Sequence, residues 1–399
     1  MLRKMTLMLA AAAAASVLAA GPGAAQDTLK IGASAPKTGP LAGGAAVTHW
    51  PNIKLWIQEV NNRGGLKVGG KQMKVELIEY DDKTSGEEAV KNIQRLATVD
   101  NVHFIVTPYS TGLNVATAPL INRYGYPHIT TSAATDNVPE FAKRWPNSFW
   151  LLGTSKQFAE GAADALKKLR DSGAIGKRVA VVNVADAFGL ELVNAGKPAL
   201  QKAGFEIVYE ASYPLGTQDV APIISAAKAA NPDAFVAFSY PPDTFALTEQ
   251  AQIQKFDVGA FYVGVGTAFP GFVGRFKDNA NGVMGVGGID PNSKAIQDYK
   301  KRHKEVTGAD IDSWASATTY AGLEILGQAI ERAGTVDKAA VIAEIRKKPF
   351  TTVIGEVDLK DNINHKVWSV GQWQGGSFNG VASDGIPGAK APVKKEPWK

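Results

Sequence analysis

Short apolar segments alternate along most of this chain with longer segments in which apolar residues recur every three or four positions. The runs at 104–106, 179–184 and 234–238 are short, rich in β-branched and aromatic residues and bounded by turn residues. Such runs predict strands buried on both faces. The segment 53–60 is of the second kind and predicts an amphipathic helix. Because alternating strands and helices form parallel sheets from right-handed βαβ units, we expect an α/β fold.

The start of the chain has the composition of a secretory signal peptide. Arg3 and Lys4 precede an alanine- and leucine-rich core, and Gly23 and Ala25 provide the small side chains that a signal peptidase requires. We predict cleavage after Ala25, so that residues 1–25 are the signal peptide and the mature chain is periplasmic. No later stretch approaches the roughly 18 uninterrupted apolar residues of a membrane span, so we expect no membrane insertion of the mature chain.

Composition excludes several classes of function. The 399 residues are enough for two domains of ordinary size. The chain contains no cysteine, which excludes disulfides, thiolate catalysis, cysteine-ligated metals and lipid attachment through a cysteine. Its formal net charge of +5 comes from charges of both signs mixed along the chain, and this pattern does not indicate a nucleic-acid partner.

Two hydroxyl-rich turns follow neighbouring strands of the predicted sheet. Ser110 and Thr111 come after the strand at 104–106, and Ala133 and Thr135 come after the next strand. Because ligands of open α/β sheets bind at the carboxyl ends of the strands, both turns should face one crevice. The free amides of a helix N-terminus favour an anion there by roughly 0.3–1 kcal/mol. Serine and threonine also cap helices without any ligand, so a purely structural role stays open.

Motifs for catalysis and for metal binding are weak in this sequence. The five histidines include no pair at i, i+4, and the chain has no Gly-x-Ser-x-Gly elbow. The glycines at 264, 266, 271 and 274 lack the Gly-Lys-Ser/Thr ending of a phosphate-binding loop. We therefore expect no enzymatic activity, no catalytic residues, no cofactor and no metal site.

Ordered short motifs carry a resemblance to a known family. They are Thr38-Gly39-Pro40, Tyr80-Asp81-Asp82, Thr107-Pro108-Tyr109-Ser110, Ser132-Ala133-Ala134-Thr135, Phe188-Gly189, Asn231-Pro232-Asp233-Ala234 and the segment 329–334. Each is weak alone, but together they span nearly the whole mature chain in the right order. The chain resembles the type I periplasmic solute-binding proteins of ABC importers, in the branched-chain (hydrophobic) amino-acid-binding group.

The resemblance implies a fold of two doubly wound parallel-sheet lobes joined by a three-crossing hinge, with the ligand in the interlobe cleft. The implied division is 26–148 plus 288–354 for lobe one, 149–287 plus 355–385 for lobe two, and 386–399 for a flexible C-terminal tail. The crossings are expected near 148–153, near 284–290 and near 353–358. Closure of such lobes on a ligand is a hinge motion.

The resemblance also assigns ligand-binding residues, with the two hydroxyl-rich turns holding the ligand carboxylate. The assigned residues are Tyr109, Ser110, Thr111, Ala133, Thr135, Trp150, Phe188, Tyr240 and Gly266. Two of these positions depart from the family pattern. Gly266 stands where the amino-acid binders have an acidic residue that pairs with the substrate ammonium, and Trp150 stands where many relatives have arginine.

These departures make lobe two less charged and more aromatic than the site of an amino-acid binder. We predict that the ligand is a small hydrophobic carboxylate, aromatic acids included, and that a monomeric receptor delivers it to the permease subunits of an ABC importer. The alternative ligand is a branched-chain amino acid, with Asp186 or Asp243 as the replacement ammonium partner. A sensory receptor module that uses the same fold is a further alternative.

Overall fold

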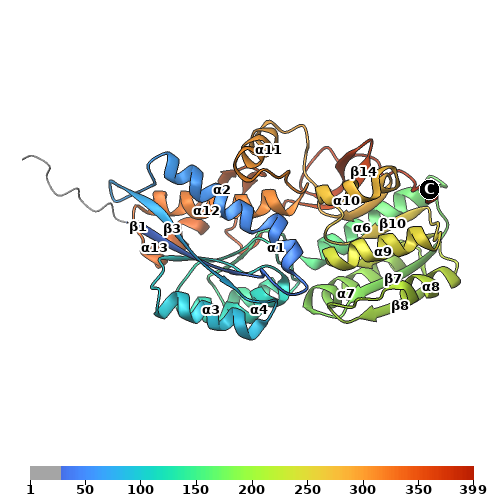
Figure 1. Cartoon of the computed structure of the whole chain (residues 1–399), viewed down its shortest axis with the longest axis horizontal. Helices are drawn as coiled ribbons and strands as arrows, with labels where there is room; N and C mark the ends of the chain where they lie inside the picture. Colours follow the sequence, from blue (N-terminus) through green and yellow to red (C-terminus); the bar gives the residue numbers. More distant parts are fainter. Residues whose placement is uncertain (1–27) are drawn as a thin grey trace, which may run out of the picture.

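The computed structural model describes residues 28–399, which form two α/β lobes side by side along the longest axis of the molecule (Figure 1). The signal-peptide prediction for residues 1–25 lies outside the described residues. No helix in the described part of the chain is both long and apolar enough to span a bilayer. The predicted α/β architecture of two lobes with mainly parallel sheets is confirmed.

Lobe one is built on a four-stranded sheet of order β2-β3-β1-β4. Its central strand β1 pairs in parallel with β3 and β4, and β2 forms an antiparallel hairpin with β3. A short parallel pair, β5 and β6, continues this lobe. The strand bounds are β1 Thr28–Ala35, β2 Leu66–Val68, β3 Lys71–Asp81, β4 Phe104–Val106, β5 His128–Thr130 and β6 Ser148–Trp150.

Helices cover both faces of the lobe-one sheet. In Figure 1, α2 and α12 lie above the sheet and α3 and α4 lie below it, and the members of each pair pack against each other. The helix bounds are α1 Ala42–Thr48, α2 Trp50–Asn62, α3 Gly86–Thr98, α4 Thr111–Arg123, α5 Val138–Arg144, α11 Lys294–Thr307, α12 Ala315–Ala333 and α13 Lys338–Lys347.

Lobe two is built on a seven-stranded sheet of order β15-β14-β11-β10-β9-β7-β8. The neighbouring strands β8, β7, β9, β10 and β11 are parallel to one another. The hairpin β14–β15 pairs with β11 in the antiparallel sense. The strand bounds are β7 Arg178–Val184, β8 Glu206–Tyr213, β9 Ala234–Phe238, β10 Ala260–Val263, β11 Val283–Val286, β14 Val367–Gln374 and β15 Ser377–Asp384. The flanking helices are α6 Ser155–Asp171, α7 Ala187–Lys202, α8 Ala221–Ala229, α9 Pro241–Ile253 and α10 Pro270–Phe276, with a 3-10 turn at Lys277–Ala280.

The chain passes between the two sheets three times, after β6, after β11 and before β14. The third passage comes later than the predicted 353–358. That segment overlaps the hairpin of β12 (Phe350–Thr352) and β13 (Gly355–Val357), and beyond it Ile363 still bridges to Trp150 of β6. The change of sheet therefore takes place between Ile363 and Val367, because local pairing keeps the preceding segment with lobe one.

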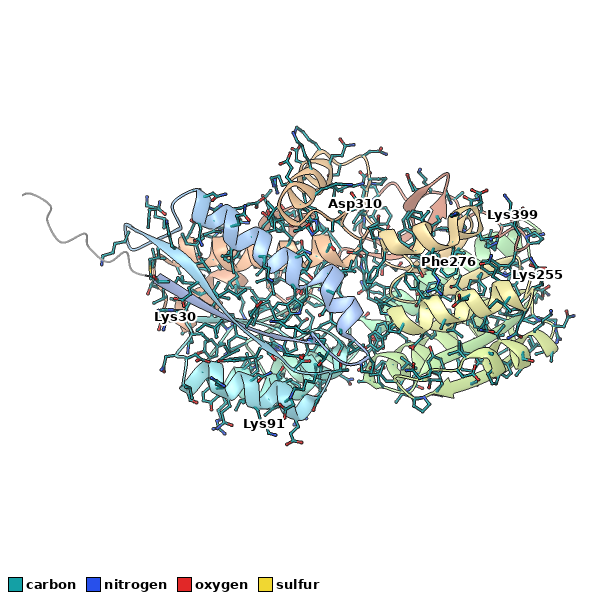
Figure 2. The ribbon with its side chains drawn as sticks, viewed as in Figure 1. Lys30, Lys91, Lys255, Phe276, Asp310 and Lys399 are labelled. Atoms are coloured by element: carbon teal, nitrogen blue, oxygen red, sulfur yellow. The ribbon has the colours of Figure 1, made fainter. Side chains whose placement is uncertain are left out.

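The C-terminal segment 386–399 was predicted to be a flexible tail, and the structure contradicts this. Trp398 is only 5 % exposed, its Nε1 donates a hydrogen bond to the Phe256 carbonyl (2.8 Å), and its ring packs edge-on against Phe261. Figure 2 shows Lys399 beside Lys255 at the outer end of lobe two, where the Lys255 Nζ donates to the Trp398 carbonyl (3.2 Å). A buried tryptophan anchors a segment whose Pro, Gly and Lys content suggested a loose end.

Candidate functional site

Ser110 occupies the turn between β4 and α4 in a conformation that non-glycine residues rarely adopt. Its φ is 89° and its ψ is 155°, a backbone strain of about 1–3 kcal/mol that persists only where the surroundings enforce it. The Ser110 amide donates to Ser132 Oγ (3.3 Å), and the Ser110 hydroxyl accepts a hydrogen bond from the Leu113 amide (3.4 Å). The second turn thus holds the first one in place.

The two hydroxyl-rich turns lie together as the sequence predicted, but some of their hydroxyls already form hydrogen bonds within the protein. Thr111 Oγ1 donates to the Ala134 carbonyl (3.1 Å) and accepts from the Ala134 amide (3.3 Å). Ala133 is buried, and its amide has no hydrogen-bond partner within residues 28–399. The donors available to an anion are therefore the Ser110 hydroxyl, the Ala133 amide and the first amides of α4.

Lobe two contributes an aromatic pair supported by a carboxylate. The rings of Phe188 and Tyr240 lie 5.0 Å apart at 32°. Asp186 caps α7 by accepting from the Gly189 amide (2.9 Å), and its second oxygen accepts from the Tyr240 hydroxyl (3.0 Å). Burial raises the pKa of Asp186 above its ordinary value. The pair is thereby fixed at the start of α7 and α9.

Tyr240 also joins the two lobes. Burial raises its pKa well above the ordinary value, the nearby Asp186 and Tyr109 raise it further, and the neighbouring Ser110 side chain lowers it. Tyr109 is buried in lobe one against Gly44, where a Cβ atom would lie 2.4 Å from the Tyr109 hydroxyl. The predicted residues Tyr109, Ser110, Phe188 and Tyr240 therefore meet at one point between the lobes.

Carboxylates surround this meeting point. Asp243 Oδ2 lies 3.5 Å from the Tyr213 hydroxyl and 3.4 Å from the Tyr240 amide, and burial raises the pKa of Asp243 to about 6. Asp312, which is fully buried before α12, accepts from two backbone amides, and burial raises its pKa as well. Within lobe two, Asp186 accepts a hydrogen bond from the Tyr240 hydroxyl, and Asp243 accepts one from the Tyr240 amide.

Glu191 of α7 is a site residue that the sequence did not reveal. Its carboxylate accepts hydrogen bonds from Thr135 Oγ1 (2.8 Å), the Asp136 amide (2.8 Å) and Asn137 Nδ2 (3.1 Å) in lobe one, and from Ser155 Oγ (3.2 Å) in lobe two. The Thr135 hydroxyl, predicted to hold the ligand carboxylate, holds a carboxylate of the protein instead. A lone glutamate on a helix surface gives no sequence signal for such a contact.

Trp150 does not line the meeting point as predicted, whereas Gly266 packs against the start of α9, next to Tyr240. Trp150 is completely buried in lobe one, in a cluster with Ala133 and Ile363, so it supports the Ala133 turn from behind. Gly266 has φ +103°, and a Cβ atom there would lie 2.9 Å from Pro241 Cα. Position 266 therefore cannot carry an acidic side chain without displacing the start of α9.

An apolar groove opens between the lobes next to these residues. Its volume is about 500 Å³, and its walls include Val47 of α1, Pro241 and Phe245 of α9, and Phe269 before α10. Pro241 follows Tyr240 directly, so the groove adjoins the aromatic pair. The described residues contain no group of three or more His, Asp or Glu side chains that could hold a metal ion.

Comparisons with known proteins agree with this architecture. Residues 28–377 match the family model of the periplasmic binding proteins. A Leu/Ile/Val-binding protein, BraC3 of Rhizobium johnstonii, is 28 % identical over 388 residues, which cover 94 % of this chain and 99 % of the relative.

Two solved structures have the same fold. The leucine-binding protein LivK of Thermotoga maritima matches with a TM-score of 0.74 and 22 % identity, covering 90 % of this chain and 99 % of that one. A Rhodopseudomonas palustris ABC-transporter solute-binding protein in complex with 3,4-dihydroxybenzoic acid matches with a TM-score of 0.75 and 22 % identity, covering 92 % and 99 %. The chain belongs to the type I periplasmic binding proteins, in the family that binds branched-chain amino acids.

Proposed function

We propose that this protein is the periplasmic receptor of an ABC importer and that it captures a small hydrophobic carboxylic acid. The observation that supports this most directly is the meeting of the Ser110 turn of lobe one with the Phe188–Tyr240 pair of lobe two. The turn offers donors at the N-terminus of α4, where a partly buried anion gains up to about 2 kcal/mol. The aromatic pair offers an apolar surface to the rest of the ligand.

The aromatic and apolar surroundings favour a flat or branched hydrocarbon body. Tyr109, Phe188 and Tyr240 are each at most 5 % exposed, and the neighbouring groove is walled by Val47 and Phe245. An aromatic ring among such side chains gains about 0.5–1.5 kcal/mol per well-oriented pair beyond its buried area. Aromatic acids are therefore the first ligands to test.

The absence of a side chain at Gly266 argues against an α-amino acid. Removing the ligand ammonium from water without giving it a carboxylate partner costs on the order of several kcal/mol, even after the protein relaxes around it. One observation favours leucine or valine as a second candidate, namely the Asp186 carboxylate beside Tyr240. Both Asp186 oxygens already accept hydrogen bonds, but a carboxylate can accept more than one hydrogen bond at each oxygen.

Capture and delivery require that the lobes close on the ligand. A ligand that touches both Ser110 and Phe188 gains those contacts together only when the cleft is shut, so it selects the closed arrangement. We infer that the closed, loaded monomer docks on the permease subunits in the periplasm and has no catalytic role. A sensory module with the same fold would show the same binding but would dock on a signalling protein.

Ligand pairs that differ only by the ammonium group test the proposal. Thermal shift followed by calorimetry would compare 4-methylpentanoate with leucine and 3-phenylpropanoate with phenylalanine, and benzoate would be added as a shorter aromatic acid. We expect stabilisation by the acids that lack the amine. Stabilisation by leucine or valine alone, abolished in Asp186→Asn, would establish the second candidate and reject the first. No saturable binding of any of these compounds would reject both.

A further inference from the structure

A cavity of about 230 Å³ lies at the hinge, apart from the interlobe site. Each of the three passages between the lobes contributes to its wall, with Leu152 in the first, Ile289 in the second and Val367 in the third. The start of α12 contributes Trp314, and the start of α11 contributes Ser293. The cavity is therefore built from those parts of the chain whose relative positions change when the lobes move.

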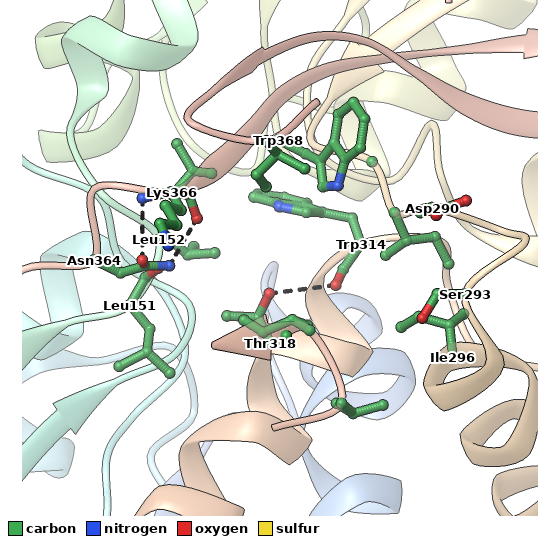
Figure 3. A pocket seen from close by; sticks show the side chains of 17 residues that line it. Leu151, Leu152, Asp290, Ser293, Ile296, Trp314, Thr318, Asn364, Lys366 and Trp368 are labelled. Atoms are coloured by element: carbon green, nitrogen blue, oxygen red, sulfur yellow. Dashed lines mark hydrogen bonds between the residues drawn. The ribbon is translucent and has the colours of Figure 1, made fainter. Parts of the chain in front are cut away.

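The walls favour an uncharged aromatic molecule. Figure 3 shows the indole rings of Trp314 and Trp368 facing the same space, with aliphatic side chains around it. The charged groups on the wall have opposite signs, since Asp290 and Lys366 both contribute, and Lys366 has Glu356 as an ionic partner at 3.8 Å. A dry apolar cavity of roughly 150 Å³ is enough to hold benzene, so this one has room for a bicyclic ring.

Trp314 connects this cavity to both lobes. It precedes α12 of lobe one, and its ring packs edge-on against Phe158 of α6 in lobe two at 5.7 Å. A Cβ atom at Gly287, in the second passage, would lie 2.1 Å from Trp314 Cγ, so the backbone there is in close contact with the indole. A rotation of the lobes must move Phe158 and Gly287 relative to Trp314, and this changes the shape of the cavity.

We propose that the hinge cavity is a second binding site, for a neutral indole-sized aromatic molecule, and that its occupation stabilises the lobe arrangement in which Tyr240 contacts Ser110. A molecule that fits the cavity in one arrangement shifts the equilibrium by its difference in affinity between the two arrangements. Its presence then raises the affinity of the interlobe ligand, and the interlobe ligand raises its affinity by the same factor. This coupling rests on the proposed function, whereas the second site itself does not.

Direct binding of 5-fluoroindole, followed by fluorine NMR on the full mature protein, tests the site without any interlobe ligand. Ser293→Trp would place an indole in the cavity, and Ser293→Ala would leave it open. Ser293 suits this pair because its side chain makes no capping hydrogen bond to α11. We expect saturable binding to the wild type and to Ser293→Ala, and at least tenfold weaker binding to Ser293→Trp. Absence of saturable binding, or equal binding to all three proteins, would overturn the proposal.

The coupling is tested by calorimetry with whichever carboxylate binds the interlobe site. Saturating 5-fluoroindole should lower its Kd severalfold in the wild type and leave it unchanged in Ser293→Trp. An unchanged Kd in the wild type would overturn the coupling. If no carboxylate binds, the proposed function fails, while the fluorine signal still decides whether the hinge site exists.

Discussion

The Glu191 contact predicts by how much a single substitution should weaken closure of the lobes. Three of the four hydrogen bonds that Glu191 accepts come from the Thr135 turn of lobe one, and these three exist only when the lobes are together. Glu191→Gln removes the charge and can place an amide donor against the Asp136 amide, which is also a donor. The closed arrangement should therefore be destabilised relative to the open one.

The size of the effect follows from the type of bond and from its exposure. A hydrogen bond to a charged group contributes about 1.5–3 kcal/mol when it is buried. Glu191 is only partly buried and regains water when the lobes separate, so we expect roughly 1–2 kcal/mol for the three bonds together. When closure is coupled to binding, this corresponds to an increase of about 5- to 30-fold in the apparent Kd of the interlobe ligand.

Calorimetry measures this Kd, and small-angle scattering of the ligand-free protein measures the closure itself. The matched control is Glu160→Gln on α6, because among residues 28–399 Glu160 forms an ion pair only with Lys156 of the same helix, at 3.8 Å. Glu191→Gln should give a larger radius of gyration than the control at a similar unfolding temperature. If Glu191→Gln and Glu160→Gln have equal Kd values and equal radii, the Glu191 contact does not contribute to closure.

Three further changes test the site and the fold. Ser110→Gly should weaken binding of the interlobe carboxylate by roughly 1–3 kcal/mol in calorimetry. The unfolding temperature should not fall, because glycine readily adopts a φ of 89°. An unchanged affinity would mean that the anion binds elsewhere. Burial raises the pKa of Asp243 from 3.8 to about 6, because the folded protein favours the neutral carboxyl over the charged one. Folding is therefore not penalised by this group below about pH 4, and the protein loses stability as the pH rises through 6 and the buried carboxyl ionises. Asp243→Asn should therefore stabilise the protein more at pH 7.5 than at pH 4.5 in thermal melts, and an equal shift at both pH values would contradict this. Trp398→Ala should cost about 3–5 kcal/mol in denaturant unfolding, as for other buried aromatic residues, and a change below 1 kcal/mol would mean that the tail is loosely held after all.

Elements and turns could be predicted from the sequence because local patterns report burial directly. The apolar run 234–238 reads as a buried strand, and in the structure β9 is buried along its whole length. The hydroxyl-rich turns follow strand ends, and the parallel topology brings their backbones together at one edge. In both cases the information lies within a few neighbouring residues.

Contacts between distant surfaces could not be predicted in the same way. Glu191 lies on a helix face that is ordinary in sequence, and its role depends on where the other lobe places Thr135. Trp398 lies in a segment that is polar on average, and one aromatic ring decides its packing. Trp150 was assigned to the cleft through the family resemblance, at a position where many relatives have arginine, yet the short β5–β6 pair turns it into lobe one.

The Glu191 contact also bears on what the interlobe site can select. Because Glu191 already accepts hydrogen bonds from the Thr135 turn, fewer donors are left for a ligand carboxylate than the sequence suggested. The remaining donors are chiefly the Ser110 hydroxyl and the Ala133 amide. Fewer polar contacts leave a larger share of the binding free energy to the apolar body of the ligand, at about 25 cal/mol per Å² of buried surface. Ligands of one size should therefore be ranked by the fit of the hydrocarbon against Phe188 and Tyr240, with the carboxylate setting orientation more than affinity.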